Sequence, residues 1–532
     1  MTNSTEYFFT NIKQKYPDYL RDESRLSGSA DSISFPKTET ELKEHIASAR
    51  KLNRAITIQG ARTGITGGAV PKGGHILNLS QMNNFLGLRH DCSSNSFFIT
   101  VQPGVLFSEI QQAVKTKQFN WADNKNHNIN NQREKRLEEF RKKKSYFFPP
   151  DITETSATIG GMVACNASGA ESFFYGPTRN YIERFRLILA DGNVLDLKRG
   201  EHKVENRCFS VKTDSGRTIE GTLPFYKLPQ VKNASGYFVK ENMDLLDLFV
   251  GSEGTLGIIS EVEIRLIPAP SAQWVVVAFF ESEDNSISFV KKIRESKQRP
   301  VAIEFFDSKG LNLFRKYKDS NTAFQEIPDI PQKWNTAVYL EFHGESEDVV
   351  ESAVTRMSEI MSECGANTDD VWLGYNERDI TRLKNFRHAI PETINMLIDE
   401  RRRKFPELTK LGTDMAVPDE MLKEVIKMYH KGLKQFSLEY VIFGHIADNH
   451  LHVNIIPNNF DEYERGKKLY LEWAQAVVKM GGTVSAEHGI GKLKIFLLQE
   501  MYGEQVIRQM QQVKRLFDPD GVLNPGNLFG DI

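Results

Sequence analysis

The sequence predicts an α+β protein whose two domains follow one another along the chain. With 532 residues, the chain is longer than one ordinary hydrophobic core can enclose. Short strands and three glycine-spaced segments precede Pro268-Ala269-Pro270, which marks a boundary. Strands and amphipathic helices follow it, a pattern typical of an antiparallel sheet covered by helices. We therefore predict a polar, partly helical lead-in at residues 1–35, a first domain at 36–268 and a second domain at 269–532.

Residue spacing places the elements of the first domain. Residues 39–53 carry apolar side chains at helical spacing, and residues 55–58 form a short apolar run. The same reasoning predicts strands at 55–58, 76–79, 96–101 and 262–267, helices at 39–53 and 105–113, and a hairpin at 185–190 and 194–197. Residues 119–146 break the pattern, because asparagines precede a run of Arg, Lys and Glu. This composition predicts a mobile insertion that ends in a short solvated helix, or else a docking patch at 133–144 for a partner or an anionic membrane.

Longer periodic segments fill the second domain. The predicted strands are 274–280, 301–306, 336–342 and 411–417, and the predicted helices are 287–297, 349–364, 377–398, 463–480 and 503–517. Tyr440 to Pro457 reads as a hairpin that completes the sheet, because two apolar runs flank the turn signal Asp448-Asn449.

The three glycine-spaced segments of the first domain predict a ligand site. Gly60, Gly64, Gly67 and Gly68 let a loop pass close to a ligand, and Arg62, Thr63 and Thr66 add donors, as a pyrophosphate requires. A flexible glycine loop is the alternative, and the spacing is not G-x-G-x-x-G. Residues 158–169 form a second small-residue run, which allows close backbone approach along a flat ring or a second phosphate. Residues 247–260 form the third segment.

The hairpin predicts a metal site. With the turn centred on Asp448-Asn449, His445 faces His452, and directly opposed residues have Cβ atoms about 4.5–5.5 Å apart. Two imidazoles at that separation can bind one ion. Glu487 and His488 add a carboxylate and another imidazole, and two histidines with a glutamate recur in catalytic metal sites. Structural histidines on a surface hairpin are the alternative.

Composition excludes several classes of protein. Lys plus Arg number 68 against 70 Asp plus Glu, a net charge of −2, so nothing indicates a nucleic-acid or membrane-surface field across the molecule. Cys92, Cys165, Cys208 and Cys364 are scattered, which indicates neither disulfides nor an iron–sulfur cluster. We see no export signal and no stretch of about eighteen apolar residues. A reducing, cytoplasmic setting is expected.

These motifs resemble a known family. The three glycine segments, with Phe148-Pro149-Pro150-Asp151 before the second, resemble the flavin-binding domain of the vanillyl-alcohol oxidase superfamily. The second half is similar to the C-terminal domain of the D-lactate, glycolate and D-2-hydroxyglutarate dehydrogenase branch, because the histidine pair, Ser485-x-Glu-His-Gly and Phe517-Asp-Pro-x-Gly-x-Leu-Asn-Pro-Gly occur together in order. The resemblance extends from about residue 36 to the end of the chain. It implies the α+β fold of that superfamily, with a two-part FAD-binding domain and a substrate domain whose final segment returns towards the flavin.

The resemblance also implies how FAD binds. Covalently flavinylated relatives carry a histidine in the first loop, where this chain has Arg62-Thr63, so non-covalent FAD is expected. Asn524 is most simply a turn residue before Pro525, with a second role near the flavin. The implied cofactor-binding residues are Gly60, Arg62, Thr63, Gly64, Thr66, Gly67, Gly68, Pro150, Asp151, Thr155, Ser156, Gly160, Gly161, Asn166, Gly169, Gly176, Glu253, Gly254, Gly257, Ile258, Ile259 and Asn524.

The resemblance further assigns a reaction centre. His445, His452 and Glu487 would bind a divalent metal (Zn, with Mn or Fe as alternatives), Arg387 would clamp a carboxylate, and His488 would be the base. Asn454, His450 and Lys410 would contact the substrate. An asparagine commonly fills position 450, so His450 is expected to add or swap a ligand; Pro391 stands where some relatives carry a substrate-binding threonine, and the spacing of Lys410 to Pro418 differs by two.

The expected activity is oxidation of a small D-2-hydroxy acid, D-lactate first, with D-2-hydroxyglutarate or glycolate as alternatives. Electrons would pass to a quinone, an electron-transfer flavoprotein or a cytochrome. Peripheral contact with the inner face of a membrane would involve residues 133–144. A flavin-dependent transferase of the alkylglycerone-phosphate synthase kind shares the cofactor domain, and a non-catalytic flavoprotein also remains open.

Overall fold

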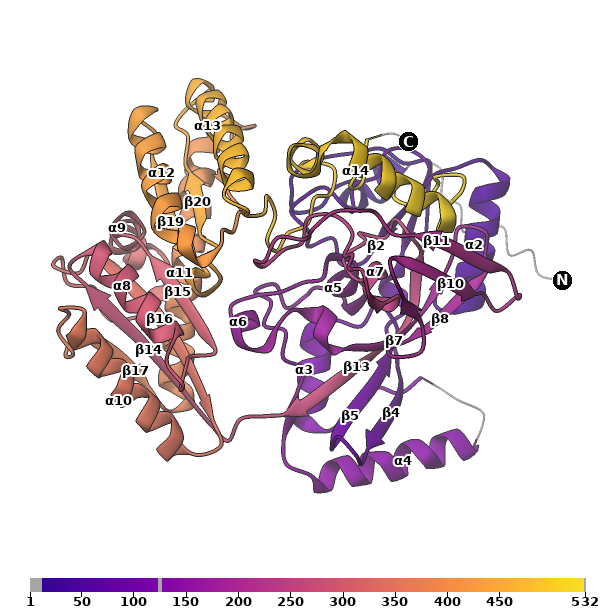
Figure 1. Ribbon diagram of the computed structural model, residues 1–532, viewed down its shortest axis with the longest axis horizontal. Helices are drawn as coiled ribbons and strands as arrows, with labels where there is room; N and C mark the ends of the chain where they lie inside the picture. The colour runs from indigo at the N-terminus through magenta and orange to yellow at the C-terminus, as the bar shows by residue number, and fades with distance from the viewer. Residues whose placement is uncertain (1–11, 123–126, 531–532) are drawn as a thin grey trace.

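The computed structural model describes residues 12–122 and 127–530, in which two sheet-based bodies lie side by side (Figure 1). The chain passes from the first body to the second through a strand-to-strand connection. The connection runs from β13 (Ile258–Pro268), in the first body, to β14 (Ala272–Phe280), in the second. The prolines of the predicted boundary therefore end β13 and separate it from β14. Among the described residues, no helix combines the length and apolarity that a membrane span requires.

Two sheets form the first body. β1, β3 and β2 make a parallel three-stranded sheet, and β4, β5, β13, β7 and β8 follow one another in an antiparallel six-stranded sheet whose sixth strand, β6, pairs with β13. The strands are β1 (Ser32–Ser34), β2 (Ile56–Gln59), β3 (His75–Asn78), β4 (Phe85–Asp91), β5 (Ser96–Val101), β6 (Tyr146–Phe147), β7 (Ile182–Ile188) and β8 (Val194–Lys198). The predicted hairpin at 185–197 is confirmed as β7–β8.

Helices and two small ribbons complete the first body. The helices are α1 (Ile12–Lys15), α2 (Glu39–Lys51), α3 (Phe107–Thr116), α4 (His127–Lys142), α5 (Ile159–Cys165), α6 (Ser172–Tyr175) and α7 (Leu246–Phe249). The ribbons pair β10 (Cys208–Lys212) with β11 (Thr218–Thr222) and β9 (Lys203–Val204) with β12 (Met243–Asp244). The glycine-spaced residues 60–68 follow β2, and residues 158–169 enclose α5, which Thr158 caps by accepting a hydrogen bond from the Gly161 N–H.

The insertion is more ordered than its composition predicts. Within the described residues it forms α4, and Leu137 and Phe140 on one face of this helix are 3% and 0% exposed. Arg133, one turn earlier, donates hydrogen bonds to the carbonyls of Leu86 and Ala122. The prediction of a mobile, solvated stretch is therefore wrong for α4, because two large apolar side chains three residues apart bury one face of a mostly charged helix. Part of the predicted insertion, 123–126, lies outside the described residues, and the docking patch stays a prediction.

The second body is a seven-stranded sheet with helices on both faces. The strands are antiparallel in the order β17, β14, β16, β15, β19, β20 and β18. Val276, Ala278 and Phe280 of β14 lie in the same hydrophobic cluster as α8 and α10, whereas alternate residues of that strand pack with α9 and α11. This alternation is the period-two pattern of a strand buried on both faces.

Two predicted elements of the second half of the chain differ clearly from the structure, and α9, α12 and β17 were not predicted. The predicted strand 411–417 is a regular strand only over β18. Beyond it, Ala416 makes isolated bridges to His450 of the hairpin and to Thr483, in the segment that leads to Glu487. The predicted helix 503–517 is the second half of α14, which bends at Gly503 (φ 75°). The remaining elements are α8 (Glu283–Arg294), β15 (Ala302–Phe306), α9 (Ser308–Tyr317), β16 (Thr336–Gly344), α10 (Glu347–Glu363), β17 (Val371–Gly374), α11 (Glu377–Arg402), β18 (Leu411–Gly412), α12 (Leu422–Gln435), β19 (Tyr440–Gly444), β20 (His452–Ile455), α13 (Phe460–Lys479) and α14 (Ile495–Phe517).

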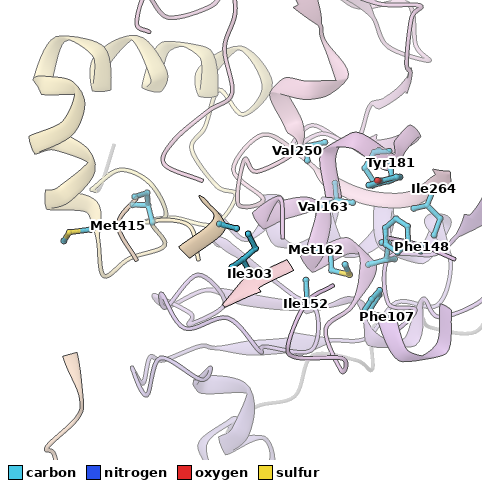
Figure 2. Close-up of a cluster of buried hydrophobic side chains, with 14 of the residues drawn as sticks. Phe107, Phe148, Ile152, Met162, Val163, Tyr181, Val250, Ile264, Ile303 and Met415 are labelled. Carbon is cyan, nitrogen blue, oxygen red and sulfur yellow. The ribbon is translucent and has the colours of Figure 1, made fainter. Parts of the chain in front are cut away.

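The two bodies share buried contacts. Figure 2 shows Met162 and Val163 of α5 among aromatic side chains of the first body, with Ile303 and Met415 of the second body in the same cluster. The end of the chain returns to the first body, where Leu523 pairs with Ile56 of β2. Segments from both halves of the sequence therefore meet around α5 and the glycine-spaced residues 60–68.

Candidate functional site

A cavity of about 430 Å³ lies where the three glycine-spaced segments meet. This volume is within the range of small-molecule sites. Its wall is mostly backbone and small side chains, and Ile58, Leu79, Pro103 and Asn527 line it although they lie outside the three predicted segments. The predicted residues that line it are Gly60, Arg62, Thr63, Gly64, Thr66, Gly68, Gly160, Gly161, Glu253, Gly254, Gly257, Ile259 and Asn524, together with Glu487 and His488.

The loop after β2 presents donors to this cavity. Across the part of the chain that the structure describes, no main-chain N–H of residues 61–68 donates a hydrogen bond to another protein group. Arg62 holds a left-handed conformation (φ 63°), and a Cβ added at Gly64 would meet open space. Consecutive unpaired amides at the wall of a cavity form an anion-binding concavity. The loop therefore fits a pyrophosphate group.

Other predicted cofactor residues do not line the cavity. Gly67, Pro150, Asp151, Thr155, Ser156, Asn166, Gly169, Gly176 and Ile258 lie outside its lining. Two of them support segments that line the cavity. Asn166 ends α5 in a left-handed conformation and accepts a hydrogen bond from the Arg179 N–H. At Gly169 an added Cβ would lie 1.6 Å from the Asp151 carbonyl oxygen, so only glycine allows these two segments to touch.

The hairpin brings the predicted metal-ligating residues together, although its register differs from the prediction. His452 pairs with Phe443 rather than His445, because Ile446–Asp448 forms a 3-10 turn and Asn449 is left-handed (φ 51°), so the connection is longer than two residues. The predicted register is therefore wrong by two. The centres of the His445 and His452 rings nevertheless lie 5.6 Å apart, because His445 directly follows β19 and His452 is the first residue of β20.

Four side chains converge beside the turn of this hairpin. One ligand atom each from His445, His450, His452 and Glu487 lies within 4.8 Å of all the others. His445 Nδ1 lies 2.6 Å from Glu304 Oε1, and its Nε2 lies 3.2 Å from Glu487 Oε2. His452 Nδ1 lies 2.9 Å from the Thr413 carbonyl oxygen. Imidazoles whose second nitrogen donates to a carboxylate or carbonyl are typical metal ligands, so the cluster fits a divalent ion.

The charges in this cluster follow from burial and from one another. Burial alone would lower the pKa of His445, but the carboxylates of Glu304 and Glu487 raise it to about 10. Burial would raise the pKa of Glu487, yet His445 and Lys232 hold it well below its usual range. Burial lowers the pKa of His452 well below its ordinary value, and the neighbouring His450 adds to this effect. His452 is therefore a neutral imidazole, the form that ligates metals.

Two residues of this site carry no sequence motif. The Lys232 ammonium pairs with Glu487 Oε1, and Lys232 Nζ lies 3.6 Å from Asp448 Oδ2. Asp414, which is fully buried, accepts hydrogen bonds from Ser485 Oγ (2.6 Å) and Lys494 Nζ (2.7 Å), and its Oδ2 lies 3.3 Å from His488 Nδ1. A single lysine or aspartate in an irregular segment gives no periodic signal, so sequence reasoning could not find them.

The predicted substrate-binding residues are only partly gathered here. Arg387 of α11 donates to Asp151 Oδ2 through both terminal nitrogens (3.2 and 3.3 Å), across the boundary between the two bodies. Asn454 lies in β20, 3% exposed. Lys410 is bonded to Asn395 (2.9 Å), and no contact joins it to the histidines among the described residues. Burial, with Arg25 nearby, lowers the pKa of Lys410 to about 8.

Comparison with known proteins matches both halves of the chain to known domains. A model of the FAD binding domain matches residues 30–128 and 133–198, and a model of the C-terminal domain of FAD linked oxidases matches residues 269–528. The chain belongs to the FAD-linked oxidase family. It is accordingly a flavoprotein oxidoreductase with the expected two-domain, α+β architecture.

Named relatives of this FAD-linked oxidase span most of the chain. A D-lactate dehydrogenase of Anaerostipes hadrus is 29% identical over 527 residues, 96% of this chain and 92% of the relative. A D-2-hydroxyglutarate dehydrogenase of Stutzerimonas stutzeri is 27% identical over 504 residues, 94% of this chain and 90% of the relative. The solved structure of an alkyldihydroxyacetonephosphate synthase covers 94% of this chain and 77% of its own at a TM-score of 0.63 and 18% identity, a likeness of fold alone.

Proposed function

We propose that the protein oxidises a small D-2-hydroxy acid to the 2-oxo acid, with FAD and a divalent metal, and that D-lactate is its substrate. D-2-hydroxyglutarate and glycolate are the alternatives. One observation carries the proposal: Glu487, whose carboxylate faces the His445 and His450 imidazoles, and His488 also line the glycine-walled cavity. An ion held by this cluster would therefore lie beside the cavity that accommodates the flavin.

FAD binds in the cavity without a covalent bond. The unpaired amides of residues 61–68 hold the pyrophosphate, and the small residues of the second and third segments flank the remaining cofactor. The histidine that tethers flavin in other relatives has no counterpart here, since Arg62 and Thr63 occupy that part of the loop. Bound FAD supplies the chemistry of accepting a hydride from C2 of the acid at N5.

The divalent ion is held by His445, His452 and Glu487. Glu304 and the Thr413 carbonyl fix the ring orientations from behind. Zinc fits a set of two imidazoles and a carboxylate, and Mn or Fe are alternatives. When bound, the ion lowers the pKa of the 2-hydroxyl group of the acid.

The protein's own groups bind the acid and move its proton. His488 Nδ1 lies 3.3 Å from Asp414 Oδ2, which leaves Nε2 to accept the hydroxyl proton. Arg387 grips the carboxylate through a bidentate pair once it parts from Asp151. Asn454 and Lys410 are further substrate contacts proposed from the resemblance, and Lys410 would have to leave Asn395 to serve as one. A quinone, an electron-transfer flavoprotein or a cytochrome takes up the electrons.

The flavin spectrum tests the proposal. The holoenzyme is mixed anaerobically with D-lactate, D-2-hydroxyglutarate, glycolate or L-lactate, before and after treatment with a chelator. We expect D-lactate to bleach the flavin, L-lactate to leave it oxidised, and chelation to abolish bleaching until metal is restored. Absence of bleaching by any of the three acids would overturn the substrate class. Undiminished bleaching after complete removal of metal would overturn the metal requirement.

A further inference from the structure

The third histidine of the hairpin has one ring nitrogen, Nδ1, for which no protein group within the described residues provides a hydrogen-bonding partner. His450 is 0% exposed, and neither ring nitrogen makes a well-directed hydrogen bond within the described part of the chain, although Nε2 lies 3.0 Å from Asp414 Oδ1. A buried imidazole nitrogen without a partner costs free energy, because it has lost its hydrogen bond to water. His450 therefore calls for a ligand.

Its orientation matches that of the two neighbouring histidines. His445 and His452 each turn one nitrogen to a carboxylate or carbonyl oxygen behind them and leave the other nitrogen facing Glu487 or the cluster. His450 repeats this arrangement, since Nε2 is next to Asp414 while Nδ1 lies 4.0 Å from Glu487 Oε2. Three imidazoles anchored from outside and open towards one point are the arrangement expected of metal ligands.

The separations also suit a shared ion. Ligands about 2.0–2.1 Å from a tetrahedral ion lie about 3.3 Å from one another. Within the cluster, Glu487 Oε2 is 3.2 Å from His445 Nε2 and 4.0 Å from His450 Nδ1, and the His450 and His452 rings are 4.4 Å apart. Small side-chain movements would bring all four groups onto one ion.

We propose that His450 is a fourth protein ligand of the metal ion and that Asp414 is the positioning residue that orients it, which rests on the metal site of the proposed function. This develops the sequence-based expectation that His450 adds or swaps a ligand, and it replaces the expectation that His450 contacts substrate. Unlike Glu487 and His488, His450 does not line the cavity, so a substrate in the cavity would not reach it. The centre is thus three imidazoles and one carboxylate, and a hydroxy acid binds by raising the coordination number rather than by filling an empty tetrahedral position.

Two measurements that do not depend on turnover test this assignment. X-ray absorption of the zinc-loaded holoenzyme counts imidazole ligands, and we expect three. Zinc titration of the metal-depleted holoenzyme gives the affinity, which we expect to fall at least tenfold in His450→Asn. In Asp414→Asn the loss should be about 10–100-fold, the range for residues that orient a ligand.

His488→Asn is the matched control, because this imidazole stacks on His452 at 5.6 Å but lies outside the cluster of four. Its zinc affinity should equal that of the wild type. Two imidazoles in the wild-type spectrum, or unchanged affinity in His450→Asn, would overturn the inference and leave the proposed function intact. Failure of the wild type to bind zinc, manganese or iron would overturn both. The imidazole count needs no variant, so a variant that fails to fold does not decide the question.

Discussion

Two buried carboxylates hold the loop that carries Glu487 and His488. Asp414 accepts hydrogen bonds from the N–H groups of Glu487 and His488, each at 3.1 Å. Glu253, which the resemblance assigns to the cofactor, uses its two oxygens for the N–H groups of Ile490 and Gly491, each at 2.7 Å. Each carboxylate thus binds a pair of consecutive amides, and charge-assisted bonds of this kind are the strong ones. The loop is therefore fixed before any ligand arrives, as a preorganised site requires.

The role of His488 as base predicts the kinetics of His488→Ala. General-base catalysis contributes about 10²–10⁴-fold, so kcat for the hydroxy acid should fall by that factor. Metal content should not change, because His488 is outside the four-residue cluster. Stopped-flow reduction of the flavin at saturating acid measures this step directly.

His430→Ala is the comparison for that experiment. His430 lies on α12, where its ring nitrogens contact Glu283 (2.9 Å) and Tyr440 at the start of β19 (3.1 Å). Neither residue belongs to the cluster of four, so the rate of flavin reduction should match the wild type. A loss below about tenfold in His488→Ala, with metal still bound, would remove His488 from the base role.

Arg387 gives a prediction about binding rather than turnover. Lysine keeps the positive charge but lacks the planar fork that pairs with both oxygens of a carboxylate. Arg387→Lys should therefore raise KM for D-lactate about tenfold or more, the equivalent of about 1.4 kcal/mol, with a smaller change in kcat. Arg382→Lys is the matched control, because Arg382 lies on the same helix and pairs locally with Asp379. Equal KM values for the two variants would contradict the clamp.

Sequence spacing predicted the convergence of the histidines better than it predicted their register. The alternation of His450, His452 and Asn454 gives the strand, but the length of a turn is not encoded in that period. The turn is longer than the predicted two residues, because Asn449 adopts a left-handed conformation, which Asn tolerates. Lys232 and Asp414 come from segments far from the hairpin, so only the fold reveals that they meet Glu487 and His450.

At the scale of elements, α4 shows where composition misleads. Its sequence is dominated by charge, and a charge-rich average predicts a solvated segment. Burial depends on spacing instead: Phe140 packs edge-on against Phe97 of β5 (4.8 Å between ring centres), and Glu139 bonds to His90 of β4. One apolar face is enough to attach the helix to the sheet.

Phe140→Ala tests this packing. Removing a fully buried phenylalanine costs about 3–5 kcal/mol of the free energy of unfolding, so the urea midpoint should fall clearly. Glu138→Ala on the same helix is the control, and as an exposed substitution it should change stability by about 0.5 kcal/mol or less. Similar midpoints for the two variants would mean that α4 is loosely attached, as its composition first indicated.

At the scale of the whole molecule, the site needs both halves of the chain. The cavity is walled mainly by the first body, the histidines come from the β19–β20 hairpin of the second, and Glu487 and His488 lie on a loop that reaches between them. The order of elements, and the boundary at Pro268-Ala269-Pro270, followed from periodicity and proline placement. The arrangement of the two bodies could not be predicted in this way, because contacts such as Arg387 with Asp151 join residues far apart in sequence.

The returning end of the chain predicts a separation between flavin and metal binding. Asn524 accepts a hydrogen bond from the Ile58 N–H (2.7 Å) and donates one to the Glu253 carbonyl (2.8 Å), so one amide joins two walls of the cavity. Asn524→Ala leaves the Ile58 N–H unpaired, at about 1–3 kcal/mol, and leaves the Glu253 carbonyl with only the longer hydrogen bond from Asn527 Nδ2 (3.3 Å). If this cost falls on the flavin-binding conformation, the Kd for FAD should rise at least about tenfold.

Zinc affinity should be unchanged in Asn524→Ala, because the hydrogen bonds of Asn524 go to the walls of the cavity and not to the cluster of four. Fluorescence titration of the flavin-depleted protein with FAD and zinc titration of the same sample measure the two affinities. Asn458→Ala, at an exposed position before α13, is the control and should alter neither. A loss of zinc affinity equal to the loss of FAD affinity would contradict this separation, because it would mean that the C-terminal segment holds the two bodies together as one cooperative unit.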